Sequence, residues 1–68
     1  MTVREMDVLL ALADGLANSE IATELHIGLD TVEGYVKMVM RKLGAKNRTH
    51  AVALAYHRGL LVKAGTAA

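Results

Sequence analysis

The chain has 68 residues, a formal net charge of +1, and neither cysteine nor proline. A chain of this length has room for one domain, which buries only about 60% of the surface that its unfolded chain exposes. The absence of cysteine excludes a disulfide framework and a thiolate metal site, so we expect a reducing, cytoplasmic location. No apolar run reaches the length that crosses a bilayer, and we expect no membrane partner.

The charges are segregated along the chain. Residues 1–33 hold one basic and seven acidic side chains, a net charge of −6, whereas residues 34–68 hold seven basic side chains and no acidic one. This pattern favours a polyanion-binding surface built from the second half. The alternative is that acids and bases pair with one another across the fold.

Start signals predict where the first three helices begin. Thr2 and Glu5 have the spacing of a capping box, which predicts a helix from about residue 3. Glu20 stands three residues after Ala17, as Glu5 does after Thr2, and Gly28 precedes the predicted start of a third helix. We therefore expect further helices from about residues 18 and 29.

Glycines mark the helix ends, because glycine tolerates the left-handed conformation that ends many helices. Gly15, Gly44 and Gly59 are expected to end the first, third and fourth helices. The second helix is short, and only His26, Ile27 and Gly28 separate it from the third. Two helices joined by a three-residue turn containing glycine are typical of a helix-turn-helix.

A fourth helix is expected from about Arg48 to Arg58, with Asn47 as its cap. The sequence therefore predicts an all-α fold, a four-helix bundle that contains a helix-turn-helix, over residues 1–62. Residues 63–68 are expected to form a disordered tail.

The third helix, expected from Leu29 to Leu43, has two different faces. Apolar residues recur at helical spacing along one side, which predicts a buried stripe of Val32, Val36, Val39, Met40 and Leu43. The opposite side is a mostly polar ridge formed by Asp30, Gly34, Lys37 and Arg41, with Glu33 and Met38 at its margins.

Several segments together resemble one family. They are Thr2–Leu9, Ala13–Ala22, Thr31-Val32 and Arg41–Gly44, and their order and spacing are similar to the LuxR-type (GerE-type) helix-turn-helix of NarL/FixJ-type response regulator output domains. The resemblance implies a domain whose third helix enters the DNA major groove and whose fourth helix forms a two-fold dimer contact. It begins with the first residues, so we expect no receiver or ligand-sensing domain in this chain.

The resemblance also implies roles for particular residues. Thr31 matches a phosphate-contacting threonine, and its place near a helix N-terminus suits an anion. Gly34 and Lys37 match base-facing positions, and Arg41 lies one turn beyond Lys37 on the same ridge. The predicted DNA-binding residues are Thr31, Glu33, Gly34, Lys37 and Arg41, with Lys42 and Lys46 as further phosphate contacts.

Four positions depart from the family pattern: Ala17, Gly28, Glu33 and Tyr35. Glu33 stands where the family usually has lysine. Its carboxylate has two open roles, either to accept a hydrogen bond from the N4 amino group of cytosine or to pair with Lys37 four residues on.

Arg48 matches an arginine common in the family. We expect it to pair with Glu5 or Glu20, and so to tie the fourth helix to the first two, rather than to contact DNA. Leu10 is expected to be exposed or to face a partner domain. Dimerisation is predicted through the fourth helix, whose apolar surface exceeds what one short helix buries internally and is formed by Val52, Leu54, Ala55 and Tyr56.

Enzymatic and cofactor-dependent functions are not expected. His26, His50 and His57 lack the spacing that places two metal ligands on one helical face, and we predict no metal and no cofactor. The favoured function is sequence-specific binding of double-stranded DNA in transcription regulation, as a homodimer. The alternative is a protein-interaction module that uses the helix-turn-helix to bind RNA polymerase or another regulator.

Overall fold

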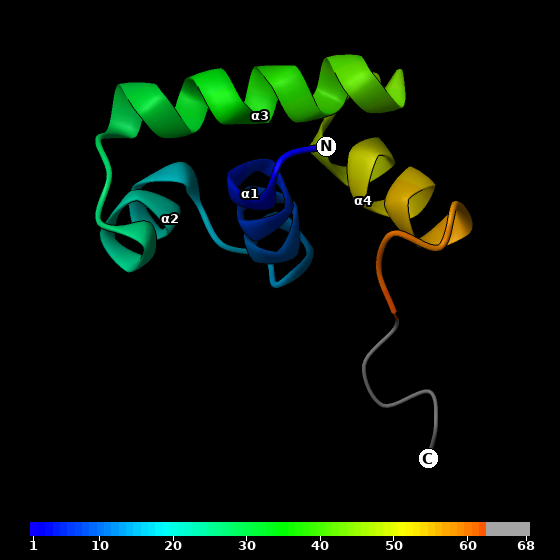
Figure 1. Ribbon diagram of the computed structural model, residues 1–68, viewed down its shortest axis with the longest axis horizontal. Coiled ribbons are helices and arrows are strands. Elements are labelled where there is room, and N and C mark those ends of the chain that lie inside the picture. Colours follow the sequence, from blue (N-terminus) through cyan, green and yellow to red (C-terminus); the bar gives the residue numbers. More distant parts are fainter. Residues whose placement is uncertain (63–68) are drawn as a thin grey trace.

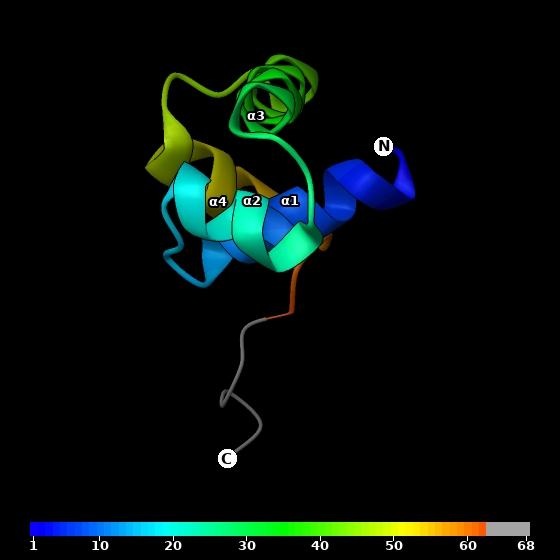
Figure 2. The ribbon, with the colours of Figure 1, turned by 90° about the vertical axis from the view of Figure 1, so that its left-hand side faces the viewer.

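The computed structural model describes residues 1–62, and within them the chain forms α-helices only: α1 (Val3–Ala13), α2 (Asn18–Leu25), α3 (Leu29–Leu43) and α4 (Arg48–His57). The predicted all-α fold is confirmed. Helix α3 runs across the other three helices (Figure 1). Seen along the axis of α3, those three helices all lie on one side of it (Figure 2). The predicted tail, residues 63–68, lies outside the described residues.

The predicted starts of α1 and α2 are both present. The Thr2 hydroxyl accepts a hydrogen bond from the Glu5 backbone N–H at 3.1 Å, and the Glu5 carboxylate accepts one from the Thr2 N–H at 2.7 Å. At α2 only half of this box forms: Glu20 accepts from the Ala17 N–H at 2.7 Å, and alanine has no acceptor to return the bond.

The turn between α2 and α3 confirms Gly28 as the cap of the third helix. Gly28 has an ordinary φ of −71° and is the N-cap of α3. The left-handed residue of the turn is His26, with φ 57° and ψ 44°. This conformation costs a residue with a Cβ about 1–2 kcal/mol. The packing of the rest of the domain therefore has to offset that cost at His26, because no glycine stands at the left-handed position.

The core consists of two clusters, and α3 contributes to both. Its first half packs Val32 and Val36 against α1 and α2, and its second half packs Val39 and Leu43 against α1 and α4. The half-buried Met40 contacts both clusters. The predicted apolar stripe is therefore confirmed, and the orientation of α3 is set along its whole length by burial.

Candidate nucleic-acid interface

The outer face of α3 is free of other elements among residues 1–62 (Figure 2). The side chains predicted for the ridge are all exposed: Asp30, Glu33, Lys37, Met38 and Arg41. Thr31, the predicted phosphate contact in the first turn, is exposed as well. The exposed backbone of Gly34 lies among them. We call this surface the α3 ridge. The opposite face of α3 carries the apolar stripe that packs into the core. The ridge can therefore contact a partner without any packed side chain having to move.

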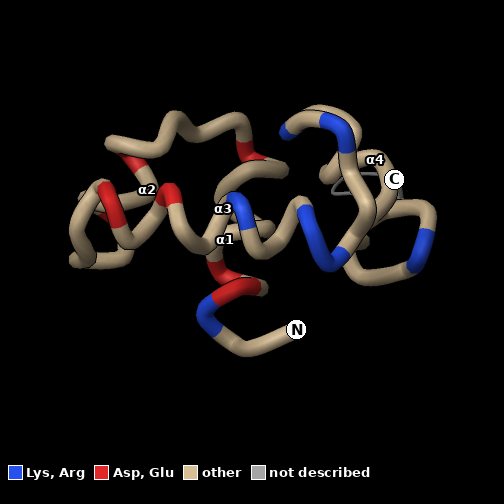
Figure 3. Tube along the Cα trace, turned by 90° about the horizontal axis from the view of Figure 1, so that it is seen from above, with Lys and Arg blue, Asp and Glu red and all other residues tan. Residues whose placement is uncertain are grey.

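Charge changes sign along the α3 ridge. The acidic Asp30 and Glu33 lie in the first half of the helix and the basic Lys37 and Arg41 in the second half, next to the other basic residues of the α3–α4 end (Figure 3). Within residues 1–62 the salt bridges are Arg4–Asp7 and Lys42–Glu5, so Glu33 and Lys37 form no ion pair. The carboxylate of Glu33 is left open to solvent or to a ligand.

Gly34 lies in the middle of the α3 ridge, and no neighbouring atom of the protein requires a glycine there. A Cβ built at this position meets no atom within 4 Å. Glycine in a helix interior costs about 0.5–1 kcal/mol relative to alanine, and no left-handed φ at Gly34 offsets that cost. The glycine removes side-chain bulk from the ridge where only an external partner would meet it.

Thr31 lies in the first turn of α3, as predicted, and is exposed. The N-cap residue Gly28 provides no side-chain hydrogen bond to this turn. The first N–H groups of a helix lack partners within the helix and carry the positive end of its dipole. A phosphate beside Thr31 would therefore find both a hydroxyl and backbone donors.

Lys42, a predicted phosphate contact, forms an ion pair within the fold. Its ammonium lies 2.8 Å from Glu5 Oε1, and the Glu5 side chain is only 6% exposed. The hydrogen bond from Lys42, followed by that from the Thr2 backbone, lowers the pKa of the Glu5 carboxyl from 4.5 to about 2. Lys42 thus braces the end of α3 against the start of α1, and its charge is engaged within the fold.

The α3–α4 loop carries Lys46, whose side chain is exposed. Its backbone N–H donates to His50 Nδ1 at 3.0 Å, while the His50 N–H donates to the Asn47 side chain at 2.8 Å. His50 therefore orders the loop that presents Lys46. The sequence analysis missed this role, although the place of His50 three residues after the predicted cap Asn47 was a usable signal.

Arg48 ties α4 to α2 and to the α1–α2 loop, through other partners than predicted. Its guanidinium donates to Asn18 Oδ1 at 2.6 Å and to the Leu16 carbonyl at 2.8 Å. The expected pairing with Glu5 or Glu20 is wrong, because Glu5 is held by Lys42 and Glu20 accepts from the Ala17 backbone.

The predicted dimer residues of α4 differ in exposure. Ala55 is fully buried, so its inclusion in the contact is wrong: its methyl group fills the core between α4 and its neighbours. Val52, Leu54 and Tyr56 are half-buried and pack against the core with part of each side chain. Leu10 of α1 is 49% exposed, as expected.

Among residues 1–62 no helix is long and apolar enough to cross a membrane. The same part of the chain contains no group of three or more His, Asp or Glu side chains placed to hold a metal ion.

Comparison with known proteins agrees with this geometry. Residues 1–55 match the model of the family described as bacterial regulatory proteins, luxR family. Over 61 residues, 90% of this chain, the sequence is 48% identical to the HTH-type transcriptional activator RamA of Corynebacterium glutamicum and 41% identical to the response regulator protein VraR of Staphylococcus aureus. The chain spans 22% and 29% of the lengths of these two relatives.

A solved structure has the same fold. The response regulator ChrA of a heme-sensing two-component system superimposes with a TM-score of 0.85 and 35% sequence identity, over 88% of this chain and 30% of ChrA. The relatives are transcription regulators and not enzymes. A helix-turn-helix domain of this kind binds double-stranded DNA in transcription regulation, and the chain belongs to the luxR family of bacterial regulatory proteins.

Proposed function

We propose that the domain binds double-stranded DNA sequence-specifically, with α3 in the major groove, and that it acts as a homodimer. The observation that carries the proposal is the α3 ridge, a polar face that no other element of residues 1–62 covers, on a helix whose other face is buried in both core clusters. The major groove admits one α-helix, and this helix projects beyond the other three.

The residues of the ridge divide by the chemistry of their contacts. Lys37 and Arg41 lie one turn apart, and both suit the acceptors on the major-groove edge of guanine. Thr31 is placed for a phosphate, as is Lys46 on the following loop. Lys42 is paired with Glu5, but its side chain is still 41% exposed, and it stays a proposed phosphate contact.

Glu33 and Gly34 are proposed to set the sequence preference. The carboxylate of Glu33 repels phosphates and accepts from the cytosine amino group, and it has no ion pair that would neutralise it among the described residues. Gly34 beside it lets the backbone approach the groove floor. Glu33 then disfavours most sequences and tolerates those with a cytosine opposite it.

The test uses a duplex selected from a random pool and measures its affinity for three single variants. Lys37→Ala and Arg41→Ala are expected to lose about 1–3 kcal/mol each when they remove a base contact. The matched control is Arg58→Ala, which removes the same charge from an exposed position at the end of α4. If circular dichroism shows all variants folded and Arg58→Ala costs as much as the ridge variants, α3 is not the reading helix.

The proposed dimer contact uses the part of α4 that the core leaves uncovered. Leu54 and Tyr56 each retain exposed apolar surface, whereas Ala55 retains none. A two-fold dimer would place the two α3 helices in successive major grooves, about 34–36 Å apart. A site with two inverted half-sites at that spacing is expected from the random pool, and selection of single half-sites only would contradict the dimer.

A second candidate function is an interaction module for RNA polymerase or another regulator, and the surface around Leu10 favours it. This leucine lines a shallow cavity of about 190 Å³ between α1 and α2, together with Asp7, Asp14 and Glu24. An exposed leucine ringed by carboxylates suits a basic partner with an apolar side chain. Leu10→Ala separates the functions: it should spare DNA affinity and lower transcription activation only if this surface contacts a partner.

A further inference from the structure

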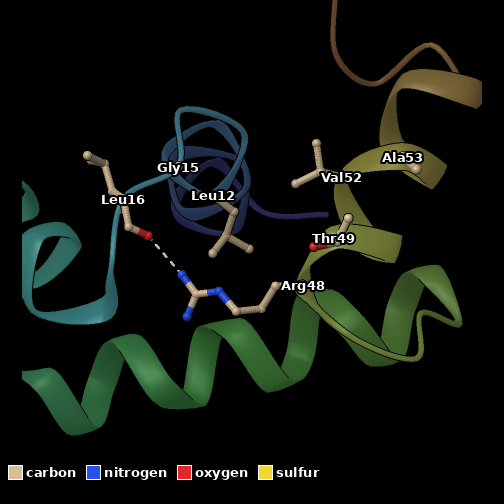
Figure 4. Close-up of a pocket in the computed structure, with 7 residues that line it drawn as sticks. All are labelled: Leu12, Gly15, Leu16, Arg48, Thr49, Val52 and Ala53. Atoms are coloured by element: carbon tan, nitrogen blue, oxygen red, sulfur yellow. Dashed lines mark hydrogen bonds between the residues drawn. The ribbon is translucent and has the colours of Figure 1, made fainter.

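A larger cavity lies away from the α3 ridge, where the end of α1 and the α1–α2 loop face the start of α4 (Figure 4). Its volume is about 510 Å³, within the range of small-ligand sites, about 300–1,000 Å³. Its apolar wall is formed by Leu12, Leu16 and Val52. Gly15, Thr49 and Ala53 contribute its edge, and Arg48 is its one charged residue.

The charge of Arg48 is not balanced locally. Both of its hydrogen-bond acceptors, the Asn18 amide oxygen and the Leu16 carbonyl, are neutral. No carboxylate among residues 1–62 lies within salt-bridge distance of the guanidinium. A guanidinium has five N–H donors in a fork that matches a carboxylate, so these two bonds leave donors for a ligand. A half-buried guanidinium forms stronger hydrogen bonds with an anion than with neutral acceptors.

We propose that this cavity binds a small amphiphilic carboxylate. The carboxylate group lies on the Arg48 guanidinium, and an apolar tail of the same molecule fills the space between Leu12, Leu16 and Val52. Concave apolar sites with one convergent polar group orient a ligand in this way. The proposal rests on the cavity and not on DNA binding.

Within the proposed dimer contact, Leu54 lies on a different flank of α4 from the cavity, whereas Tyr56 lies one turn beyond Val52 on the cavity side. Successive residues of an α-helix turn by about 100°, so Leu54 points about 200° away from Val52. A second copy that contacts Leu54 alone therefore leaves the cavity open, and one that also covers Tyr56 borders the cavity edge. Because Arg48 also holds Asn18, the first residue of α2, a bound carboxylate acts on the contact that joins α4 to the helix-turn-helix.

The test titrates the isotope-labelled chain with octanoate and follows its backbone amides by NMR. We expect saturable shifts of Gly15, Asn18, Arg48 and Ala53. Octanamide, which has the same tail and no charge, should bind roughly tenfold more weakly, the effect of losing about 1.4 kcal/mol at the guanidinium.

Two tryptophan variants provide the matched control. Ala53→Trp places a large side chain at the cavity edge from an exposed position and should abolish the shifts. Arg58→Trp adds the same side chain at the exposed C-cap of α4, on a different side of the helix from Ala53, and should preserve them. Circular dichroism verifies that both variants remain folded.

Three results would overturn the proposal. One is equal binding of octanoate and octanamide, which would exclude a carboxylate seat on Arg48. Another is unchanged octanoate binding by folded Ala53→Trp, which would place the ligand elsewhere. The third is a shift of the same amides with protein concentration alone, which would mean that a second copy of the chain occupies the cavity.

Discussion

Replacing Gly34 by alanine should raise the stability of the domain and lower its affinity for DNA. The position lies inside α3 with no left-handed φ, and an added Cβ meets nothing within 4 Å. Alanine should therefore stabilise the domain by about 1 kcal/mol, which raises the melting temperature of a domain of this size by about 4–8 °C. If α3 closely approaches the groove at Gly34, the methyl group overpacks that contact and costs about 1–3 kcal/mol of affinity.

The assay pairs a thermal melt followed by circular dichroism with titration of the selected duplex. Gly44→Ala is the matched control, because its Cβ also meets open space but its φ of 70° is left-handed. That variant should lose about 1–2 kcal/mol of stability. A Gly34→Ala protein that melts higher and binds its site unchanged would refute the close approach, and one that melts lower would refute the helix-interior argument itself.

Three further predictions test the ridge, the dimer and the α1–α3 brace. Glu33→Lys should bind random duplex more tightly, with a steeper salt dependence and a weaker preference at one base position; uniform gain with unchanged preference would mean that Glu33 reads no base. Leu54→Lys should weaken cooperative binding to a two-fold site and spare a single half-site, whereas equal loss on both would count against the α4 contact. Ionised Glu5 stabilises the fold above its unfolded pKa of 4.5, and this contribution disappears as the pH falls toward about 2, the pKa in the fold. Glu5→Gln should accordingly melt lower at neutral pH and show a flatter pH dependence between those values; an unaltered pH profile would argue against the brace.

The helices and their faces followed from local signals in the chain. The Thr2–Glu5 box, the caps at Gly28 and Asn47 and the glycine at position 44 act within a few residues of themselves. The apolar stripe of α3 could also be predicted from the sequence, because helical periodicity alone decides which side chains share a face. The all-α fold and the ridge that forms the candidate interface were therefore predictable before any tertiary contact was known.

Tertiary structure decided which charged and apolar side chains remain available. Lys42 and Lys37 look equivalent along the chain, yet only Lys42 reaches Glu5, 37 residues away. Arg48 donates to the backbone carbonyl of Leu16. Every residue has such a carbonyl, so the residue types in the sequence do not indicate which one will be the acceptor. Ala55 and Leu54 are adjacent apolar residues, but the rotation of α4 against α1 and α3 buries the first completely and the second only in part. Pairing and burial of this kind depend on distances between helices, which the packing of both core clusters sets and local sequence does not encode.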